Sequence, residues 1–491
     1  MSKLFHGGRL ASQRRDVVRF TASIKDDIRL FDSTIRINQA HVVMMSEQGI
    51  IQENVASRLL RALSKTKVSK TDSIAEDIHM LIEEQITKFA GADVGGNLHI
   101  GKSRNDQVVA AIRMTLRDEL ISLVSTLIGM QESLLKTADQ HTLTIIPGYT
   151  HTQPAQPITF AHYLISFFDA FDRDIRRMKE TYVRVNKSPM GAAALATTSF
   201  PINRMRMAEL LGFQGLLENS LDAVSSRDFI LETQMHLSLL ASNLSRLTED
   251  LILWSSVNFD TIELPDSFAS TSSIMPQKKN PDVLEVIRAR TSDVLGNLAA
   301  TLTTLKGLPS GYNMDFQEIT PKLWGSIKRM LESLNMLKAM LPLLIVKDTS
   351  DKLLKGYVTS TEIANVLTRK YGIPFRRAHK AVGLLVHHMI ERHLTFSDSI
   401  VSLLESILTK ETGKSLKITE SDVISAVDPT DFVVSHNVKG GPAPREVRRM
   451  LKDRNRQLTI LKNTVESERG YLELHRHNLG KAIESIIRSR S

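Results

Sequence analysis

Four short polar segments interrupt a chain that is otherwise rich in apolar residues at helical spacing. They are residues 103–107, 147–157, 270–282 and 311–318, and glycine or proline marks them or their borders. Loops that interrupt the helices of a bundle are where such a fold places its ligands and catalytic groups. We therefore expect the chemistry of this protein in these segments.

The second segment offers a group for proton transfer. His151 is its only histidine, and Pro147, Pro154 and Pro157 fix the backbone around it. An imidazole titrates near neutral pH, which suits it to acid–base catalysis. A lone histidine is usually structural, but this one is flanked by hydroxyl and amide side chains, so both roles stay open.

The third segment has the features of an anion site. A hydroxyl-rich loop, residues 270–273, leads to Lys278 and Lys279, and then to the start of a helix. Asn280 is a suitable N-cap, Pro281 suits the first helical position, and the free amides of that helix end would attract an anion. The alternative is a surface loop, but the number of features favours function.

The first segment, Ser103 to Gln107, has five consecutive polar residues where a loop meets a helix. It could bind a carboxylate through Arg104, or it could simply cap the helix that follows. The fourth segment is uninformative alone.

Residues 96–103 match the phosphate-loop pattern G-x-x-x-x-G-K-S. Such a loop needs a buried strand before it and a helix after it. Residues 77–89 instead have the pattern of an amphipathic helix, and only the short segment around residues 91–94 separates that helix from the motif. We therefore interpret the segment as a glycine-rich turn and reject nucleotide hydrolysis.

Composition excludes several classes of protein. The 491 residues contain no cysteine, which rules out disulfide scaffolds, thiolate metal sites and a cysteine nucleophile. The net charge is +9, but the basic clusters at 173–179 and 445–456 are interleaved with acidic and apolar residues. We interpret them as solvated helix faces and expect no nucleic-acid partner.

We also find no residue pattern typical of a targeting signal in the sequence. No apolar signal-peptide core follows the first residues, and the chain has no run of 18 apolar residues. We expect a cytoplasmic protein with no membrane association.

The elements that must position the polar segments are long helices. Apolar residues alternate at three- and four-residue steps in three stretches, the longest of about 25 residues, which predicts bundle seams. The stripes are Ile230, Leu237, Leu240, Leu244, Leu247, Leu251 and Trp254; Leu116, Leu120, Leu123, Leu127, Met130 and Leu134; and Ile287, Val294, Leu298, Thr301 and Leu305.

The predicted fold is all-α with three domains. Residues 1–101 form an amino-terminal helical domain, residues 102–350 an elongated central bundle, and residues 351–491 a carboxy-terminal domain of shorter helices broken by glycine and proline. Leu239, Ile252 and Leu253 lie outside the narrow stripe and imply a second buried face. That face could serve oligomerisation or wider packing within the chain.

The polar segments resemble the signatures of the argininosuccinate lyase family, in the fumarase/aspartase superfamily. Residues 272–281 are similar to the superfamily signature, and Gln277-Lys278-Lys279 matches the argininosuccinate branch, where fumarases usually carry Gly-Lys-Val. Residues 103–107 point to the same branch. The resemblance runs from Gly7-Gly8-Arg9 through Glu318 and beyond.

This resemblance implies a fold, an assembly and a reaction. The family has a central five-helix bundle and forms homotetramers around a twenty-helix core, and each active site draws on three subunits. Its reaction is the reversible β-elimination of argininosuccinate to arginine and fumarate, in arginine biosynthesis, with no metal and no cofactor. A different fumarate-releasing lyase of the superfamily and a crystallin-like structural homologue are the alternatives.

The resemblance also implies residue roles. Ser272 would be the general base, His151 the acid that protonates the leaving nitrogen, and Glu285 the partner of His151. Thr320 departs from a position that is basic in many members, so one carboxylate contact is either lost or supplied by Lys322. The substrate-binding residues implied are Ser23, Asp27, Asp77, His79, Arg104, Asn105, Thr150, Lys278, Asn280, Tyr312 and Gln317.

Overall fold

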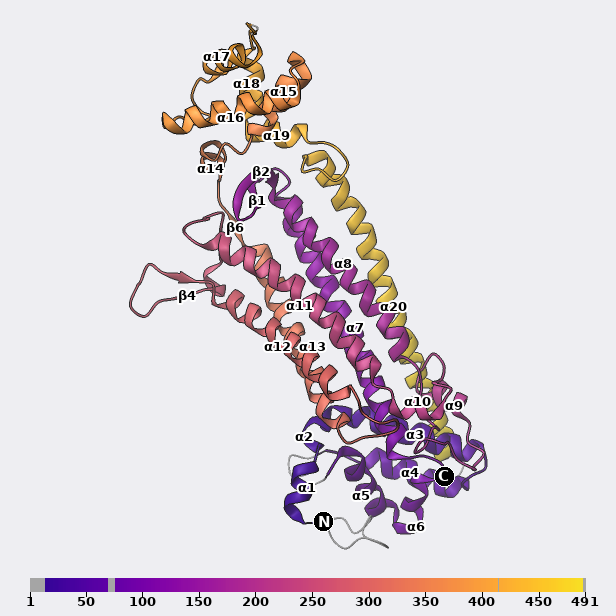
Figure 1. The fold of residues 1–491 in the computed structure, drawn as a ribbon. Coiled ribbons are helices and arrows are strands. Elements are labelled where there is room, and N and C mark those ends of the chain that lie inside the picture. Colours follow the sequence, from indigo (N-terminus) through magenta and orange to yellow (C-terminus); the bar gives the residue numbers. More distant parts are fainter. Residues whose placement is uncertain (1–13, 69–75, 414, 489–491) are drawn as a thin grey trace.

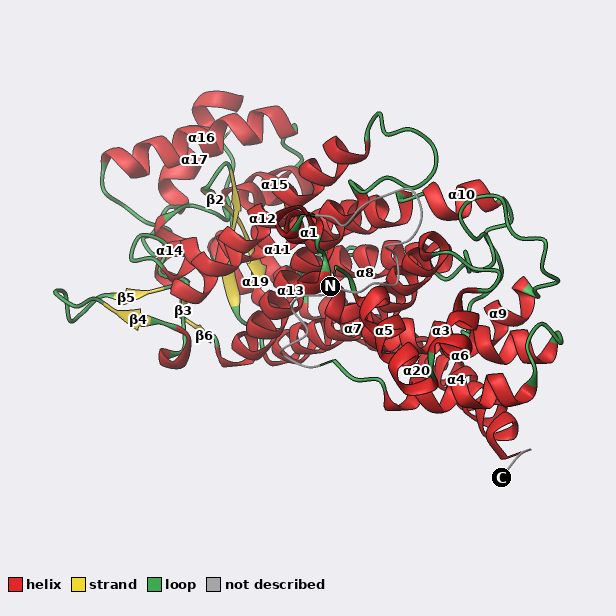
Figure 2. Ribbon diagram, turned by 90° about the horizontal axis from the view of Figure 1, so that it is seen from below, coloured by secondary structure: helices red, strands yellow, loops and turns green. Residues whose placement is uncertain are grey.

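The computed structural model describes residues 14–68, 76–413 and 415–488. Within this part of the chain the fold is almost entirely helical, with only short strands (Figures 1 and 2). The all-α prediction is confirmed. Gly7, Gly8 and Arg9, quoted above for the resemblance, lie outside the described residues.

Short helices at one end of the molecule form the amino-terminal part (Figure 1). The helix predicted at 77–89 is confirmed as α5, and the Asp77 side chain caps it by accepting a hydrogen bond from the Met80 amide at 2.7 Å. The elements are α1 (Arg15–Thr21), α2 (Ile24–Asp27), η1 (Ile28–Leu30), α3 (Phe31–Glu47), α4 (Glu53–Lys65), α5 (Ile78–Ala90), α6 (Ala92–Gly95) and η2 (Gly96–His99).

Long helices lying side by side form the elongated centre of the described chain (Figure 1). Every residue of the first two apolar stripes is buried, so those stripes face the core, as their spacing predicts. In the third stripe Ile287, Val294 and Thr301 are buried. The central five-helix bundle is confirmed as α7 (Arg104–Gln140), α8 (Phe160–Val185), α11 (Asp228–Ser255), α12 (Asp282–Leu305) and α13 (Phe316–Met340).

An antiparallel hairpin that the sequence analysis did not predict joins α7 to α8. It consists of β1 (Ile145–Thr150) and β2 (Gln153–Thr159). Prolines fit here because each strand has an unpaired edge. The other elements that connect bundle helices are α9 (Arg204–Leu210), α10 (Ser220–Ser225), β3 (Ile262–Glu263), η3 (Asp266–Phe268), β4 (Ser270–Thr271), β5 (Lys279–Asn280), η4 (Leu341–Leu343) and β6 (Ile345–Val346).

A second, smaller core lies beyond the bundle and is separate from the main one. Gly372, with φ of 64°, ends α15, and Asp428 caps α19 by accepting hydrogen bonds from two backbone amides at 2.8 Å. The breaks predicted there are confirmed. The helices are α14 (Ser350–Lys355), α15 (Ser360–Tyr371), α16 (Phe375–Glu391), α17 (Val401–Thr412), α18 (Glu420–Val427) and α19 (Pro429–Ser435).

The expectation of only shorter helices after residue 350 is wrong, because α20 (Pro444–Arg488) has 45 residues. It runs along the bundle back to the amino-terminal end, packed against α7 (Figure 1). A buried apolar stripe on this otherwise charged helix explains the packing. The domain boundaries stay a prediction. The stripe is Val447, Leu451, Leu458, Val465, Leu472 and Leu479.

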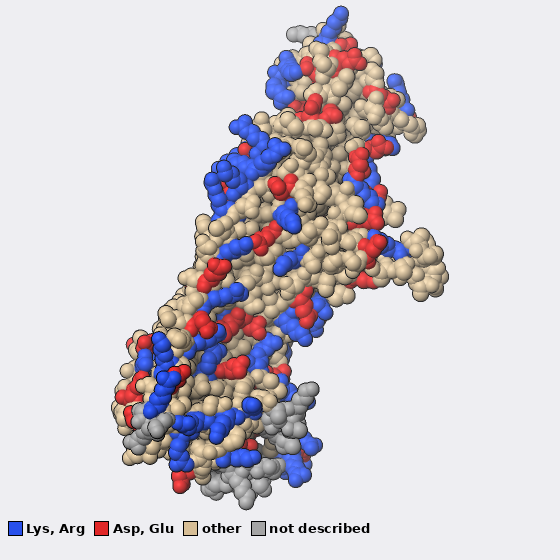
Figure 3. Space-filling model, turned by 180° about the vertical axis from the view of Figure 1, so that it is seen from behind, with Lys and Arg blue, Asp and Glu red and all other residues tan. Residues whose placement is uncertain are grey.

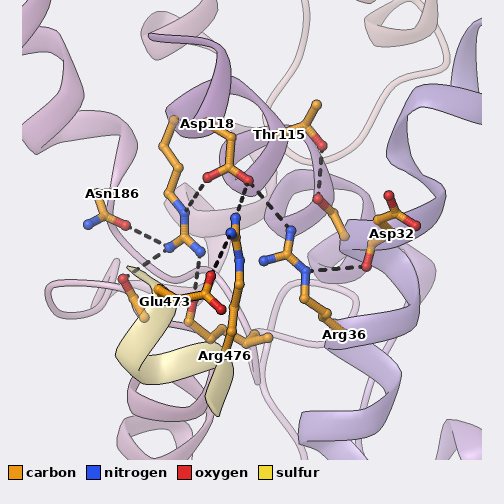
Figure 4. A network of polar contacts seen from close by, with 11 residues as sticks. Asp32, Arg36, Thr115, Asp118, Asn186, Glu473 and Arg476 are labelled. Carbon is orange, nitrogen blue, oxygen red and sulfur yellow. Dashed lines mark hydrogen bonds and ion pairs between the residues drawn. The ribbon is translucent and has the colours of Figure 1, made fainter. Parts of the chain in front are cut away.

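A polar network joins the carboxy-terminal half of α20 to α3 and α7 (Figure 4). Asp118 lies 2.9 Å from Arg476, 3.6 Å from Arg36 and 3.9 Å from the Nε atom of Arg117. Arg117 is only 1% exposed, donates to the Asn186 side chain at 3.0 Å, and has its pKa lowered to about 10 by burial. One carboxylate therefore serves three guanidinium groups from three helices.

Acidic and basic side chains are interleaved over much of the face in Figure 3. In the cluster at 445–456, Arg449 bridges Glu446 and Asp453, and Arg454 pairs with Asp169 at 2.7 Å. These pairs fit the interpretation of solvated helix faces. None of the described helices combines the length and apolar composition needed to cross a bilayer.

Candidate functional site

One pocket at the amino-terminal end gathers many of the residues that the resemblance singled out. It contains about 500 Å³ of empty space, a volume that includes its opening to solvent. Its walls come from α2 and η1, the start of α5, the first three turns of α7, the residue before α11 (Asp228–Ser255), and the start of α13 with the loop before it. The predicted residues that line it are Ser23, Asp27, Asp77, His79, Arg104, Tyr312 and Gln317.

Three carboxyl groups line the pocket: Asp26, Asp27 and Asp77. Burial raises the pKa of Asp27 to about 7, although the Ser23 hydroxyl donates to this carboxyl, and the nearby charge of Asp77 adds to the rise. Asp77 itself forms an ion pair with Arg104 at 3.0 Å. A guanidinium entering the pocket would favour the ionised form of Asp27.

Neutral polar groups complete the pocket. His79 is buried, both its ring nitrogens lack a hydrogen-bond partner among the described residues, and burial lowers its pKa to about 4. Gln317 donates to the Tyr312 hydroxyl at 3.4 Å. Buried polar atoms without partners are uncommon, so the His79 imidazole has hydrogen-bonding capacity left for a ligand.

Arg227, which the sequence analysis missed, also lines this pocket. It is 3% exposed, and its Nε and Nη2 atoms have no hydrogen-bond partner among the described residues. Its guanidinium stacks 4.1 Å from the ring centroid of Phe316, and burial lowers its pKa to about 9. Because Arg227 lies outside the four polar segments, beside the first apolar stripe, only the three-dimensional structure brings it to the pocket.

Thr320 and Lys322, the two residues considered for the departure at position 320, differ in their relation to the pocket. Thr320 lines the pocket and donates to the Phe316 carbonyl at 3.1 Å. Lys322 is not among the lining residues, and its ammonium donates to the Glu318 carbonyl one turn back. Within one chain Lys322 therefore makes no contact in this pocket, and both alternatives for the carboxylate contact stay predictions.

Asn105 lies beside this pocket but does not line it. Its amide nitrogen donates to the Ala194 carbonyl at 3.0 Å. Ser103 and Asp106 form a capping box at the start of α7, so the helix-cap interpretation of segment 103–107 is confirmed. Arg104 nevertheless faces the pocket, so one segment holds both structural and pocket-lining residues.

The β1–β2 hairpin lies at the other end of the bundle (Figure 1), and Thr150 and His151 are at its tip. Thr150 pairs with Gln153, which leaves His151 and Thr152 as a two-residue turn with φ of 54° and 58°. Positive φ is unfavourable for residues with a branched or bulky side chain. A strained, exposed histidine at a hairpin tip is a reason to expect function there.

Ser272 lies in the loop between β4 and β5, which projects from the side of the bundle (Figure 1). Its Oγ atom accepts hydrogen bonds from the amides of Ile274 at 3.2 Å and Met275 at 3.1 Å. Two amides aimed at one oxygen stabilise negative charge on it. This is the help that a serine needs to act as a base.

The two lysines of this loop differ in their partners. Lys279 pairs with Glu263 at 3.0 Å and with Asp266 at 2.6 Å. Lys278 is exposed and has no ion pair with a described residue. Of the two cations, Lys278 is therefore the one that remains available to an anionic ligand.

The prediction that Asn280 caps the following helix is wrong. Asn280 is part of β5 and pairs with Ser270, which holds its backbone in extended conformation. The helix α12 begins at Asp282, with Pro281 at the N-cap position and no side-chain cap.

Glu285 lies exposed in the first turn of α12. Within the described residues of one chain, no hydrogen bond or ion pair joins it to His151. One chain thus carries three separate groups of predicted site residues: the amino-terminal pocket, the hairpin tip, and the β4–β5 loop with the start of α12 (Figure 1).

The described residues include no group of three or more His, Asp or Glu side chains placed to hold a metal ion. Residues 96–99 form η2 directly after α6, so no strand precedes the G-x-x-x-x-G-K-S pattern. Lys102 is 8% exposed, and its ammonium donates to the Asn38 side chain. The rejection of a phosphate loop is confirmed.

Comparisons with known proteins agree with these features. Residues 13–296 match the family described as Lyase, and residues 357–434 match the family described as Argininosuccinate lyase C-terminal. An argininosuccinate lyase from Methanocaldococcus jannaschii is 44% identical over 453 residues, covering 91% of this chain and 92% of its own length. One from Methanosarcina mazei is 41% identical over 490 residues, covering 99% of both chains.

Solved structures show the same fold. EDDS lyase in complex with formate superposes with a TM-score of 0.88 at 30% identity, covering 98% of this chain and 97% of that chain. A class II fumarase from Schistosoma mansoni, 16% identical with a TM-score of 0.72, covers 87% of this chain and 96% of its own and shares the fold alone. Near-complete coverage at over 40% identity, with a matching carboxy-terminal family, leads to one assignment: this lyase belongs to the argininosuccinate lyase family of the fumarase/aspartase superfamily.

Proposed function

We propose that this enzyme cleaves argininosuccinate to arginine and fumarate, as a step of arginine biosynthesis in the cytoplasm. The observation that carries the proposal is the near-full-length identity to argininosuccinate lyases. The branch-specific segments at 103–107 and 277–279 support it. The reaction removes a weakly acidic proton beside a carboxylate, so the resulting negative charge must be stabilised before the C–N bond breaks.

In this proposal Ser272 removes the proton. The hydrogen bonds from the Ile274 and Met275 amides stabilise the alkoxide form, and Lys278 adds a positive charge nearby. Each such donor is worth about 3–4 kcal/mol when it acts on developing charge. Without them a serine hydroxyl is too weak a base at neutral pH.

His151 protonates the departing nitrogen, and Glu285 sets the charge and orientation of its imidazole. The exposed, strained position of His151 supports this role, because an acid must reach the leaving group. Thr150, Lys278 and Asn280 hold the succinyl carboxylates together with Arg104 and Asn105.

The amino-terminal pocket receives the arginine end of the substrate. Asp27 and Asp77 supply negative charge for the guanidinium, and Ser23 orients Asp27. His79, Tyr312 and Gln317 add hydrogen-bonding groups on the neighbouring walls.

We propose that the active site is shared among three chains of a homotetramer. The three groups of site residues lie apart in one chain, so a complete site needs other copies. The outer faces of the long helices also leave large apolar side chains exposed, which suits burial against another bundle. They are Met235, Leu239, Val286, Leu295, Leu302 and Met336.

The direct test is ultraviolet absorbance of fumarate after argininosuccinate is added to freshly purified enzyme. We expect steady fumarate release, with arginine formed in equal amount. A panel of other succinyl adducts, including those of adenylosuccinate type, serves as control. No fumarate from argininosuccinate, or faster release from another adduct, contradicts the proposal.

A further inference from the structure

A buried carboxylate that the proposed mechanism does not use lies directly after Arg104 and Asn105. Asp106 is completely buried, in the first turn of α7. One of its oxygens accepts a hydrogen bond from the Ser103 amide at 3.1 Å. This hydrogen bond completes the capping box of α7 and uses only one of the two carboxylate oxygens.

The second oxygen of Asp106 holds a different segment of the chain. It accepts hydrogen bonds from the amides of Gly191 at 3.1 Å and Ala193 at 2.9 Å. Residues 191–193 are buried, and residues 194–197 that follow are exposed. Asp106 therefore joins the pocket-lining end of α7 to the base of an exposed loop.

The loop in turn contacts a predicted substrate-binding side chain. The Ala194 carbonyl accepts the hydrogen bond from Asn105, one residue before Asp106 in α7. The backbone at Ala193 and Ala194 therefore fixes where the Asn105 amide points, and Arg104 lies in the same turn of α7.

This segment has a conformation that needs an external anchor. Ala193 and Thr197 have φ of 52° and 60°, which is unfavourable for residues other than glycine. Gly191, at φ of 82°, leaves no room for a side chain, since a Cβ atom would lie 2.6 Å from the Arg204 side chain. Strained backbone of this kind persists only where its surroundings hold it in place.

Burial and hydrogen bonding act on the charge of Asp106 in opposite directions. Burial raises the pKa of Asp106 to about 6, whereas the amides that donate to it and the nearby Lys102 oppose this rise. Arg204 donates to the Met190 carbonyl at 3.0 Å. Three amide donors converge on its two oxygens. An asparagine could not replace it, because its amide nitrogen would face another donor.

We propose that Asp106 is a positioning residue, which anchors the loop at 189–197 against the first turn of α7 and so orients Asn105 and Arg104 toward the substrate. The expected kinetic effect rests on the proposed function, whereas the anchoring of the loop does not depend on that function.

The test compares Asp106→Asn with Asp174→Asn, a matched control. Asp174 is also a buried carboxylate; it accepts hydrogen bonds from Arg177 of the same helix, α8, at 2.9 Å and from Asn243 of α11 at 2.8 Å. In hydrogen exchange of the whole enzyme, peptides covering 189–197 should exchange at least about tenfold faster in Asp106→Asn and at the wild-type rate in Asp174→Asn. Unchanged exchange in Asp106→Asn overturns the proposal.

The kinetic readout separates positioning from stability. With argininosuccinate, kcat/KM should fall about 10²-fold in Asp106→Asn, chiefly through a higher KM, because misplacement of binding groups has effects of this size. Asp174→Asn should stay within about twofold of wild type. Equal kinetic losses in the two variants contradict positioning, whereas an inactive wild type contradicts the proposed function and leaves the exchange result to decide the anchoring.

If Asp106→Asn does not fold, Gly191→Ala gives the same information. It keeps the carboxylate but displaces the loop, so it should show the same fast exchange and the same rise in KM. Wild-type exchange and kinetics in Gly191→Ala would overturn the proposal.

Discussion

Ser272 carries its own electrostatic support, because two backbone amides of its loop point at its oxygen. Replacing it by alanine removes the base but no packing, since the loop is exposed. We expect Ser272→Ala to fold and assemble as wild type and to lose about 10²–10⁴-fold in kcat. Fumarate absorbance and size-exclusion chromatography measure the two effects. A rate near that of wild type would show that the base lies elsewhere.

Asp27 should make stability depend on pH. Its pKa in the folded protein is about 7, above the ordinary value of 3.8, so folding disfavours its ionised form. Its contribution to stability is present at low pH and is lost as the pH rises towards 7. Asp27→Asn, which is neutral at every pH, should therefore gain stability over wild type between pH 5 and pH 8.

We expect this gain to be on the order of 1–3 kcal/mol by urea denaturation at the two pH values. Asp32→Asn is the control, because Asp32 is an exposed carboxylate in α3 and is not among the groups that shift the pKa of Asp27. Its stability difference from wild type should be the same at both pH values. A pH-independent difference for Asp27→Asn would show that Asp27 is not buried as described.

At the scale of elements, α20 depends on the network around Asp118. Asp118→Ala leaves the guanidinium groups of Arg36, Arg117 and Arg476 without their common carboxylate. The pairs are partly exposed, so we expect a loss of about 1–3 kcal/mol in the free energy of unfolding. Glu473→Ala removes only one exposed pair to Arg476 and should cost less than about 0.5 kcal/mol. Equal losses in the two variants would contradict a central role for Asp118.

Sequence periodicity predicted three of the five bundle helices, α7, α11 and α12, because each has an apolar stripe that must be buried. It did not predict the β1–β2 hairpin, whose prolines are typical of loops and whose pairing depends on residues 145 and 159 meeting in space. It also missed the length of α20, because this helix is highly charged and its apolar stripe is narrow.

The candidate functional site was likewise predicted only in part. Motifs identified segments 103–107 and 272–281, but spacing could not reveal that Arg227 enters the amino-terminal pocket or that Asp106 reaches the loop at 189–197. Such contacts join parts of the chain more than 80 residues apart.

For the whole molecule, the proposed homotetramer means that chains share their active sites. The hairpin that carries His151 and the loop that carries Ser272 lie apart in one chain (Figure 1). Two inactive variants, Ser272→Ala and His151→Asn, should therefore restore each other when their subunits mix. A site that takes these two residues from different chains is intact in about a quarter of cases in an equal mixture.

The most direct measurement is fumarate release by Ser272→Ala and His151→Asn, unfolded together, refolded as a mixture, and shown by native mass spectrometry to have co-assembled. Each variant refolded alone is the control. The shared-site account predicts that the mixture regains about a quarter of wild-type activity while each variant alone stays inactive. A co-assembled mixture as inactive as its two components would contradict it.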